Sequence, residues 1–300
     1  MAAEIPGSCP SRRGIRWRTN LSSSISQTRF GLKVKTATLT LPLPASRALN
    51  VLRYLPLYVS DPALRRQWRA EDSLERALRA GMQFDLPLDE RSAGTSERTV
   101  EVPWVMARLP QGRGSRLLDV GSAFAPHSYR RLLALSSGRL ELHSVDLLPT
   151  RVPGVTEHLA DARSLPFRTG SFEAVICIST LEHIGMDNGA YGLPPDEAST
   201  SRADVAALRE LGRVAARFPG LLVTVPGGVE ANFGWSRQYS PTSWRETVAR
   251  AGLEVQEISY FRHGSAGWRM CEPEDLAGRT YGEEARAASA LICARLARPE

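Results

Sequence analysis

Acidic and polar residues follow four successive apolar runs of this sequence, at the points where the runs end. Asp119, Asp146 and Asp161 close the first three runs, and residues 179–183, Ser-Thr-Leu-Glu-His, close the fourth. If these runs are parallel strands of one sheet, their carboxyl ends share an edge, which is where ligands of such sheets bind. The spacing therefore predicts one binding site, built from the ends of four strands.

Several of these positions suit a nucleoside. Gly121 permits a tight turn after the first run, and Asp146, 25 residues further on, can accept hydrogen bonds from both ribose hydroxyls. Asp161 can accept from an adenine amino group, and Ala162 leaves room beside the ring. A pyrophosphate would need the three-glycine turn G-x-G-x-x-G, but residues 121–126 contain one glycine. The pattern favours a nucleoside cofactor without phosphates, although each aspartate taken singly also fits an ordinary turn.

The elements that must position these residues alternate between strand and helix. Strands are expected at residues 116–121, 141–147, 157–161, 173–179, 220–226 and 254–261, with a seventh inside 288–298; helices are expected at 126–136, 202–217 and 242–251. Several strands are apolar on both faces, which indicates a mostly parallel sheet covered on both sides. No helical crossover precedes the last strand. We therefore predict an α/β, Rossmann-like, doubly wound sheet of seven strands with an antiparallel edge strand.

Composition and charge divide the chain into three parts. Residues 1–35 hold seven basic side chains and one acidic one, which accounts for the net charge of +6 and predicts a disordered basic tail. Residues 36–98 are expected to form a helical N-terminal extension, whose amphipathic stretch 64–82 would serve as a lid or a homodimer contact. Residues 99–300 are expected to form the Rossmann-like domain. Because the charge lies in the tail, nothing indicates a basic groove for nucleic acid.

Other classes of protein are disfavoured by what the sequence lacks. No apolar run approaches the roughly 18 residues of a membrane span, and no secretory signal is visible. The four cysteines form no Cys-x-x-Cys pair and the histidines no spaced set, so we predict no metal. A reduced, cytoplasmic setting is the expectation.

The motifs together resemble class I S-adenosylmethionine-dependent methyltransferases. The resemblance covers about residues 100–298 and rests on Leu-Leu-Asp119-Val-Gly-Ser, on Val-Asp146, on Asp161-Ala-Arg-Ser-Leu-Pro-Phe and on Ser171-Phe-Glu through Leu-Glu-His-Ile-Gly185. The continuation to Tyr191-Gly is similar to methyltransferases of bacterial sugar and small-metabolite pathways. Two departures are Ala123, where a second glycine is usual, and Glu173, where aspartate is commoner.

This resemblance implies S-adenosylmethionine as the cofactor and assigns its contacts. Asp119 and Gly121, with Ser122, would shape the methionine pocket. Asp146 would hold the ribose, and Asp161 with Ala162 the adenine. Leu147, next to Asp146, is a further expected cofactor contact. The methyl-donor side would be lined by the end of the fourth strand, that is by Ser179, Thr180, Glu182 and His183.

The acceptor side offers one candidate base and several candidate contacts. His183 has an ordinary pKa near neutrality and could take the proton of a hydroxyl nucleophile; alternatively it only orders its loop. The insert 185–201 fits a substrate lid or a solvated loop, from which Asp187 and Tyr191 could reach an acceptor. A cluster containing Trp235, Arg237 and Tyr239 suits a sugar ring or an anionic group, or packs under the sheet edge.

We therefore predict methyl transfer from S-adenosylmethionine to a small polar acceptor, a hydroxyl of a sugar or secondary metabolite. The alternatives are an NAD-dependent oxidoreductase, a non-catalytic cofactor-binding subunit and, if the basic tail matters, a nucleic-acid methyltransferase.

Overall fold

The computed structural model describes residues 28–29, 32–33, 61–80, 86–110, 112–123, 129, 133, 136, 139–194, 202–282 and 288–300. Contacts divide the chain into two units, residues 1–40 and 41–300. In the first, strands β1 (Thr28–Arg29) and β2 (Leu32–Lys33) pair antiparallel. All the helices and strands described below belong to the second unit. The three-part division that composition predicts, into residues 1–35, 36–98 and 99–300, stays a prediction.

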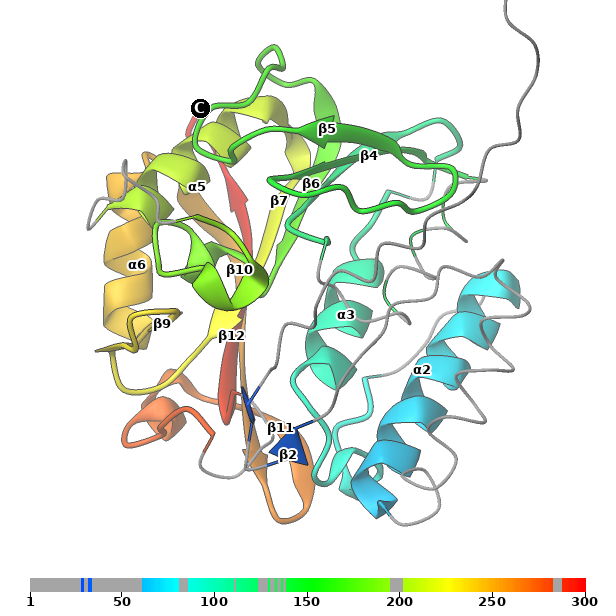
Figure 1. Ribbon diagram of the computed structural model, residues 1–300, viewed down its shortest axis with the longest axis vertical. Helices are drawn as coiled ribbons and strands as arrows, with labels where there is room; N and C mark the ends of the chain where they lie inside the picture. Colours follow the sequence, from blue (N-terminus) through cyan, green and yellow to red (C-terminus); the bar gives the residue numbers. More distant parts are fainter. Residues whose placement is uncertain are drawn as a thin grey trace, which may run out of the picture. The chain divides into compact units, whose positions relative to one another are not determined.

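An eight-stranded sheet forms the centre of the second unit (Figure 1). Its order is β11-β10-β12-β7-β6-β3-β4-β5. The strands are β3 (Arg116–Val120), β4 (Glu141–Asp146), β5 (Thr156–Leu159), β6 (Phe172–Ile178), β7 (Ala215–Pro226), β10 (Glu254–Gly264), β11 (Gly267–Cys271) and β12 (Ala290–Ala297). Strands β3 to β7 are parallel, and β12 is antiparallel to both β7 and β10. The predicted doubly wound, mostly parallel sheet is confirmed.

Two details of the predicted sheet are wrong. The last strand, β12, is antiparallel as expected, but it lies between β7 and β10 and not at an edge. Seven of its eight residues are buried, because both of its edges are paired and both of its faces are covered. The eighth strand, β11, forms the true antiparallel edge as the hairpin partner of β10. It is short and half exposed, so it lacks the apolar run that identifies the inner strands.

Helices cover both faces of the sheet (Figure 1). Helices α5 (Ala203–Val214) and α6 (Pro241–Arg250) pack on one face, and α3 (Arg98–Met106) packs on the other, against β6 and β12. Helix α2 (Pro62–Ala80) contacts α3. Of the expected helix 126–136, the structure describes residues 129, 133 and 136, which are helical.

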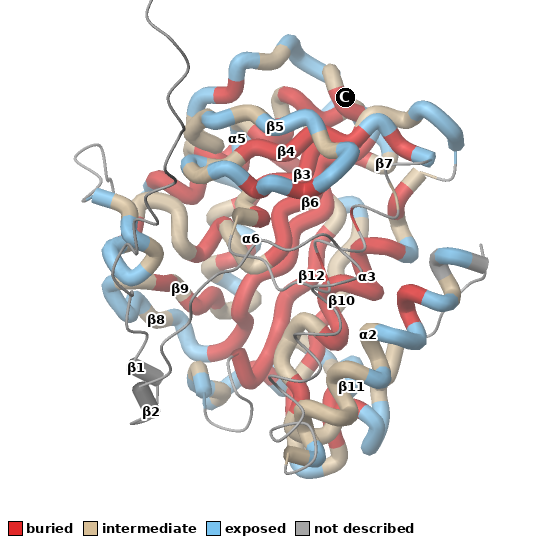
Figure 2. Tube along the Cα trace, turned by 45° about the vertical axis from the view of Figure 1, so that its right-hand side comes forward, coloured by how far each residue is buried: buried red, intermediate tan, exposed pale blue. Residues whose placement is uncertain are grey.

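The interior follows the alternation of the strands. In β6, Val175 and Cys177 belong to the core under α5 and α6, whereas Ala174, Ile176 and Ile178 belong to the core under α3. Figure 2 shows the central strands buried along their length and β5 largely exposed. This packing fixes which side chains emerge at the carboxyl ends of the strands.

The connections are short elements. They include the 3₁₀ helices η1 (Glu90–Ser92), η2 (Leu181–His183), η3 (Gly189–Tyr191) and η4 (Pro273–Leu276), and the pair β8 (Ala231–Asn232) with β9 (Arg237–Gln238). Helix α5 ends three residues earlier than the predicted 217, because the chain turns directly into β7 at Ala215. Within the described ranges, no helix is long and apolar enough to cross a membrane.

Candidate active site

A cavity of about 810 Å³ lies at the carboxyl ends of β3, β4 and β6. Its volume falls within the roughly 300–1,000 Å³ typical of small-molecule sites. The predicted residues that line it are Asp119, Gly121, Ser122, Asp146, Leu147, Asp161, Ala162, Ser179, Thr180, His183 and Tyr191. Residues that lie far apart in the sequence thus converge on one cavity, at the edge where the sequence places the site.

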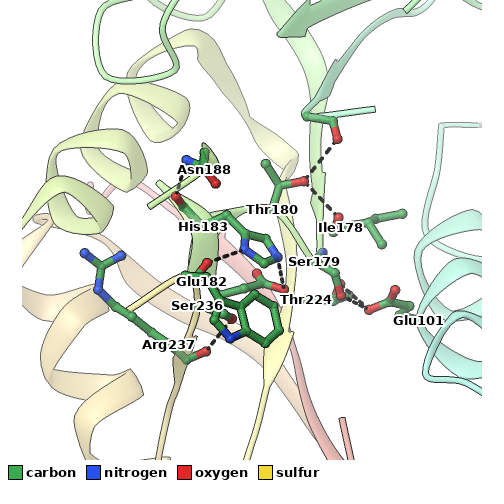
Figure 3. A network of polar contacts seen from close by, with 12 residues as sticks. Glu101, Ile178, Ser179, Thr180, Glu182, His183, Asn188, Thr224, Ser236 and Arg237 are labelled. Carbon is green, nitrogen blue, oxygen red and sulfur yellow. Dashed lines mark hydrogen bonds and ion pairs between the residues drawn. The ribbon is translucent and has the colours of Figure 1, made fainter. Parts of the chain in front are cut away.

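Gly121 stands where no other residue fits. Its φ is +84°, and a Cβ built there would lie 2.1 Å from Thr180 Cγ2. The Gly121 N–H donates to the carbonyl of Val145 at 3.0 Å, which ties the turn to the neighbouring strand. Thr180 Oγ1 donates to the Ile178 carbonyl at 3.0 Å and lies 3.4 Å from that of Gly121 (Figure 3). The glycine therefore lets the end of β6 approach the turn after β3.

Asp119 is a buried carboxyl on the cavity wall. Its Oδ1 accepts a hydrogen bond from the Tyr129 hydroxyl at 2.6 Å. Burial raises its pKa to about 6, against the lowering effect of that hydrogen bond. Asp119 Oδ2 and Ser122 Oγ are buried and make no hydrogen bond within the described residues, although Ser122 lies close enough to lower the pKa of Asp119. These two oxygens are suited to a polar group of a bound ligand.

The backbone orients the Asp146 carboxylate. Its Oδ2 accepts from the Ala123 N–H at 2.9 Å and its Oδ1 from the Leu148 N–H at 3.1 Å. Burial raises the pKa of Asp146, while these hydrogen bonds oppose the rise. Each carboxylate oxygen can accept a further hydrogen bond. Ala123 thus contributes its N–H to the site.

Asp161 already has a strong partner. Arg163 donates from Nε to both carboxylate oxygens at 3.0 Å and from Nη2 to Oδ2 at 2.6 Å. Burial acts to raise the pKa of Asp161, but the hydrogen bonds from Arg163 outweigh it and hold the pKa below its ordinary value. A ligand group that donates to this carboxylate would share it with Arg163.

A buried carboxylate on α3 supports the end of β6. Ser179 has a φ of +41°, and its N–H donates to the carbonyl and the Oγ1 of Thr224, both at 3.1 Å. Ser179 Oγ and Thr224 Oγ1 donate to Glu101 Oε2 at 2.7 and 2.9 Å (Figure 3). Glu101 is fully buried and forms an ion pair with Arg98, which lines the cavity. This network holds a strained residue at the cavity wall.

His183 lies in a defined tautomer. Its Nδ1 lies 2.8 Å from the carbonyl oxygen of Trp235, which can only accept, so Nδ1 carries the hydrogen. In the neutral ring Nε2 then has a lone pair, and it lies 3.9 Å from Glu182 Oε1. Glu182 is buried behind the cavity wall, and burial raises its pKa to about 8. His183 can therefore accept a proton at Nε2.

The structure places one of the predicted acceptor contacts, Tyr191, at the cavity. The other four, Asp187, Trp235, Arg237 and Tyr239, do not line it. Asp187 Oδ1 accepts from the Gly189 N–H at 2.9 Å, and Arg237 Nη1 donates to the Ile184 carbonyl at 2.7 Å. Tyr239 is a core residue whose hydroxyl donates to Asp204 at 2.9 Å. Tyr239 therefore packs in the core, which was the alternative to a ligand contact. Arg237 orders the loop after β6.

Sequence reasoning missed several lining residues. They are Arg98, Tyr129, Arg163 and Ile184. Asn188, Leu193 and Pro194 also line the cavity; they lie in the insert 185–201, for which a lid or a solvated loop is predicted without naming these residues as contacts. One signal was available: Arg98 and Glu101 are an i, i+3 charge pair in an otherwise apolar helix. The others are brought to the cavity only by tertiary packing.

The fold and this cavity define a Rossmann-like protein with a site of small-molecule size at the carboxyl edge of its sheet. No family model matches the chain, and no curated protein does. Several solved structures do match. One is a S-adenosylmethionine-dependent methyltransferase from Methanosarcina mazei, which is 12% identical to this chain with a TM-score of 0.42; the match covers 66% of this chain and 98% of that protein.

Two further solved structures are similar to the chain. The (4+2)-cyclase SpnF is 18% identical with a TM-score of 0.41, covering 64% of this chain and 71% of its own. A S-adenosylmethionine-dependent methyltransferase from Thermotoga maritima is 18% identical with a TM-score of 0.40; the match covers 65% of this chain and 86% of that protein. Structures of S-adenosylmethionine-dependent methyltransferases are thus among those that the chain resembles.

Proposed function

We propose that this protein transfers a methyl group from S-adenosylmethionine to a small polar acceptor, a hydroxyl of a sugar or secondary metabolite. The observation that carries the proposal is the cavity itself. Three carboxylates from successive strand ends line it, and Thr180 fills the space beside the single glycine of the turn after β3. A nucleoside without phosphates suits this cavity better than a dinucleotide does.

The residues present fit the cofactor. Asp146 would accept hydrogen bonds from the ribose hydroxyls, and Asp161 with Ala162 and Leu147 would surround the adenine. The amino-acid part of the cofactor is a zwitterion, and the cavity offers an opposite charge for each of its groups. Arg98 would bind the carboxylate, and the Oδ2 of Asp119, which makes no hydrogen bond to the described residues, would accept from the ammonium.

The bound cofactor would supply an electrophilic methyl group with its own leaving group. The protein then has to align the acceptor oxygen, exclude water and take up a proton. His183 Nε2 would accept that proton, because Nδ1 is held as a donor by the Trp235 carbonyl. Glu182 lies 3.9 Å from Nε2, but burial keeps its carboxyl protonated near neutral pH, so it would offer no negative charge to the resulting imidazolium.

The rival functions differ in what they require. An NAD-dependent oxidoreductase needs room for a pyrophosphate at the turn that Thr180 closes. A binding subunit without turnover would share the cofactor contacts but would not need the oriented His183. A homodimer and a cytoplasmic setting stay predictions.

Calorimetric titration of the full-length chain tests the proposal. We expect saturable binding of S-adenosylmethionine at one site per chain and no measurable binding of NAD. Retention of NAD with no binding of S-adenosylmethionine would reverse the assignment.

A further inference from the structure

The end of the cavity beyond His183 is chemically unlike the nucleoside end. It is lined by Ile184, Gly185, Asn188, Tyr191, Leu193 and Pro194. Ile184 packs against the hydrophobic core, and Asn188 Nδ2 donates to the carbonyl of His183 at 3.0 Å. Apart from the imidazole, the described side chains of this end thus offer mainly apolar and aromatic surface.

Such a surface discriminates between classes of hydroxyl compound. A sugar carries several hydroxyls, and each one that loses water without gaining a hydrogen-bond partner weakens binding. Among the described side chains of this end, His183, Asn188 and Tyr191 carry polar atoms. A flat ring with one hydroxyl would bury its faces against apolar atoms and direct its single polar group at His183.

Aromatic contacts fix the plane of the imidazole. Tyr191 meets His183 edge-on, with ring centroids 5.7 Å apart at 78°. Trp235 stacks on it at 5.6 Å and 25°. Phe233, 39% exposed, stacks on Trp235, and Tyr281 contacts both of these rings. Of these rings, His183 and Tyr191 line the cavity, and a planar ring could pack on them with offset or edge-on geometry.

The acidity of the acceptor hydroxyl also favours a phenol over a sugar. A phenol has a pKa of about 10, whereas water and simple alcohols lie near 16. An imidazole with an ordinary pKa of about 6.5 is a much better match for the phenol, since proton transfer to a base becomes more costly as the two pKa values diverge.

We propose that the acceptor is a planar aromatic compound with a phenolic hydroxyl, bound between Tyr191 and the apolar residues 184 and 193–194. This inference rests on the proposed function. The phenolic O–H proton passes to His183 Nε2, and the oxygen forms a bond to the methyl carbon as the carbon–sulfur bond breaks. The products are an aryl methyl ether and S-adenosylhomocysteine, and the positive charge of the sulfonium ends on the imidazolium.

A binding experiment on the full-length protein separates this inference from the proposed function. Binding of S-adenosylhomocysteine is measured first, and its absence would count against the proposed function alone. The loaded protein is then titrated with 7-hydroxycoumarin, 2-naphthol and methyl α-glucopyranoside. We expect at least one phenol to bind with a Kd below about 1 mM and the glucoside not to bind.

Variants locate the bound phenol. Tyr191→Ala should weaken phenol binding at least fivefold, Tyr191→Phe should restore it, and neither should change binding of S-adenosylhomocysteine more than twofold. Phe218→Ala removes an aromatic ring that is 74% exposed on β7 and does not line the cavity, so it should change nothing. Glucoside binding in preference to both phenols, no binding of either phenol, or no effect of Tyr191→Ala would overturn the inference.

Discussion

Thr180 occupies the space that a side chain at Gly121 would need, since a Cβ there would lie 2.1 Å from Thr180 Cγ2. The positive φ of Gly121 adds a cost of about 1–2 kcal/mol for any L-residue. We therefore expect Gly121→Ala to lower the melting temperature and to weaken binding of S-adenosylmethionine at least tenfold. Gly114 is the matched control: it has a φ of +80° with nothing within 4 Å of its Cβ position. If Gly114→Ala were equally damaging, backbone strain and not Thr180 would be the cause.

Replacing Asp146 tests the ribose contact. Asp146→Asn removes the charged acceptor and places an N–H group against the N–H of Ala123 or Leu148. We expect the Kd for S-adenosylmethionine to rise about 10- to 30-fold, equivalent to about 1.4–2 kcal/mol. Asp187→Asn, outside the cavity, should leave this Kd unchanged in the same titration. Equal affinities for the Asp146 variant and the parent would remove Asp146 from the cofactor site.

Removal of the buried carboxylate on α3 should destabilise the protein. Glu101→Gln leaves Arg98 without its charged partner and weakens the support of Ser179. We expect the free energy of unfolding in urea to fall by roughly 2–4 kcal/mol. Glu90→Gln, at an exposed position of η1, should change it by less than about 0.5 kcal/mol. Similar losses in both variants would show that Glu101 has no special role.

The raised pKa of Glu182 predicts how stability depends on pH. The folded protein holds this proton up to about pH 8, whereas the ordinary value is 4.5. Because the folded state binds the proton more tightly, the free energy of unfolding falls as pH rises through this window, and the penalty is complete above pH 8. Glu182→Gln cannot ionise, so relative to the parent it should gain on the order of 1–4 kcal/mol between pH 5 and pH 8.5.

Urea unfolding at those two pH values checks this prediction. The exposed Glu254→Gln provides the control, and its stability should follow that of the parent at both values. Parallel pH dependence of the Glu182 variant and the parent would mean that Glu182 ionises in the folded protein as readily as in the unfolded chain.

His183 should affect turnover more than cofactor binding. With 7-hydroxycoumarin as acceptor, we expect His183→Ala to lower kcat by about 10²-fold or more, the scale of a lost general base. The Kd for S-adenosylmethionine should stay within about threefold. Equal rates in variant and parent would remove His183 from the proton transfer and leave it the role of ordering its loop through the Trp235 carbonyl.

Elements that carry a local signal in the sequence could be predicted from it. The inner strands carry apolar runs, so their ends, and with them Asp119 and Asp146, could be placed at one edge. Asp161 follows β5, an exposed edge strand with a weaker signal. Gly252, with a φ of +72°, ends α6 close to the predicted position. These features depend on residues that are neighbours in the chain.

Features that depend on distant pairing could not be derived in this way. The place of β12 between β7 and β10 is decided by antiparallel pairing across long separations. Tyr239 looked like a ligand contact because its buried partner, Asp204, lies 35 residues earlier in the sequence. The role of Glu101 could not be predicted from the sequence, because only the tertiary structure brings it to Ser179 and Thr224.

The most direct test of the cofactor assignment is a crystal structure of the full-length protein with S-adenosylhomocysteine. We predict density for the adenosyl group in the 810 Å³ cavity, with both ribose hydroxyls within hydrogen-bond distance of Asp146 and the amino-acid part between Asp119 and Arg98. An empty cavity in crystals grown at saturating ligand, or a ligand bound away from Asp146, would contradict it.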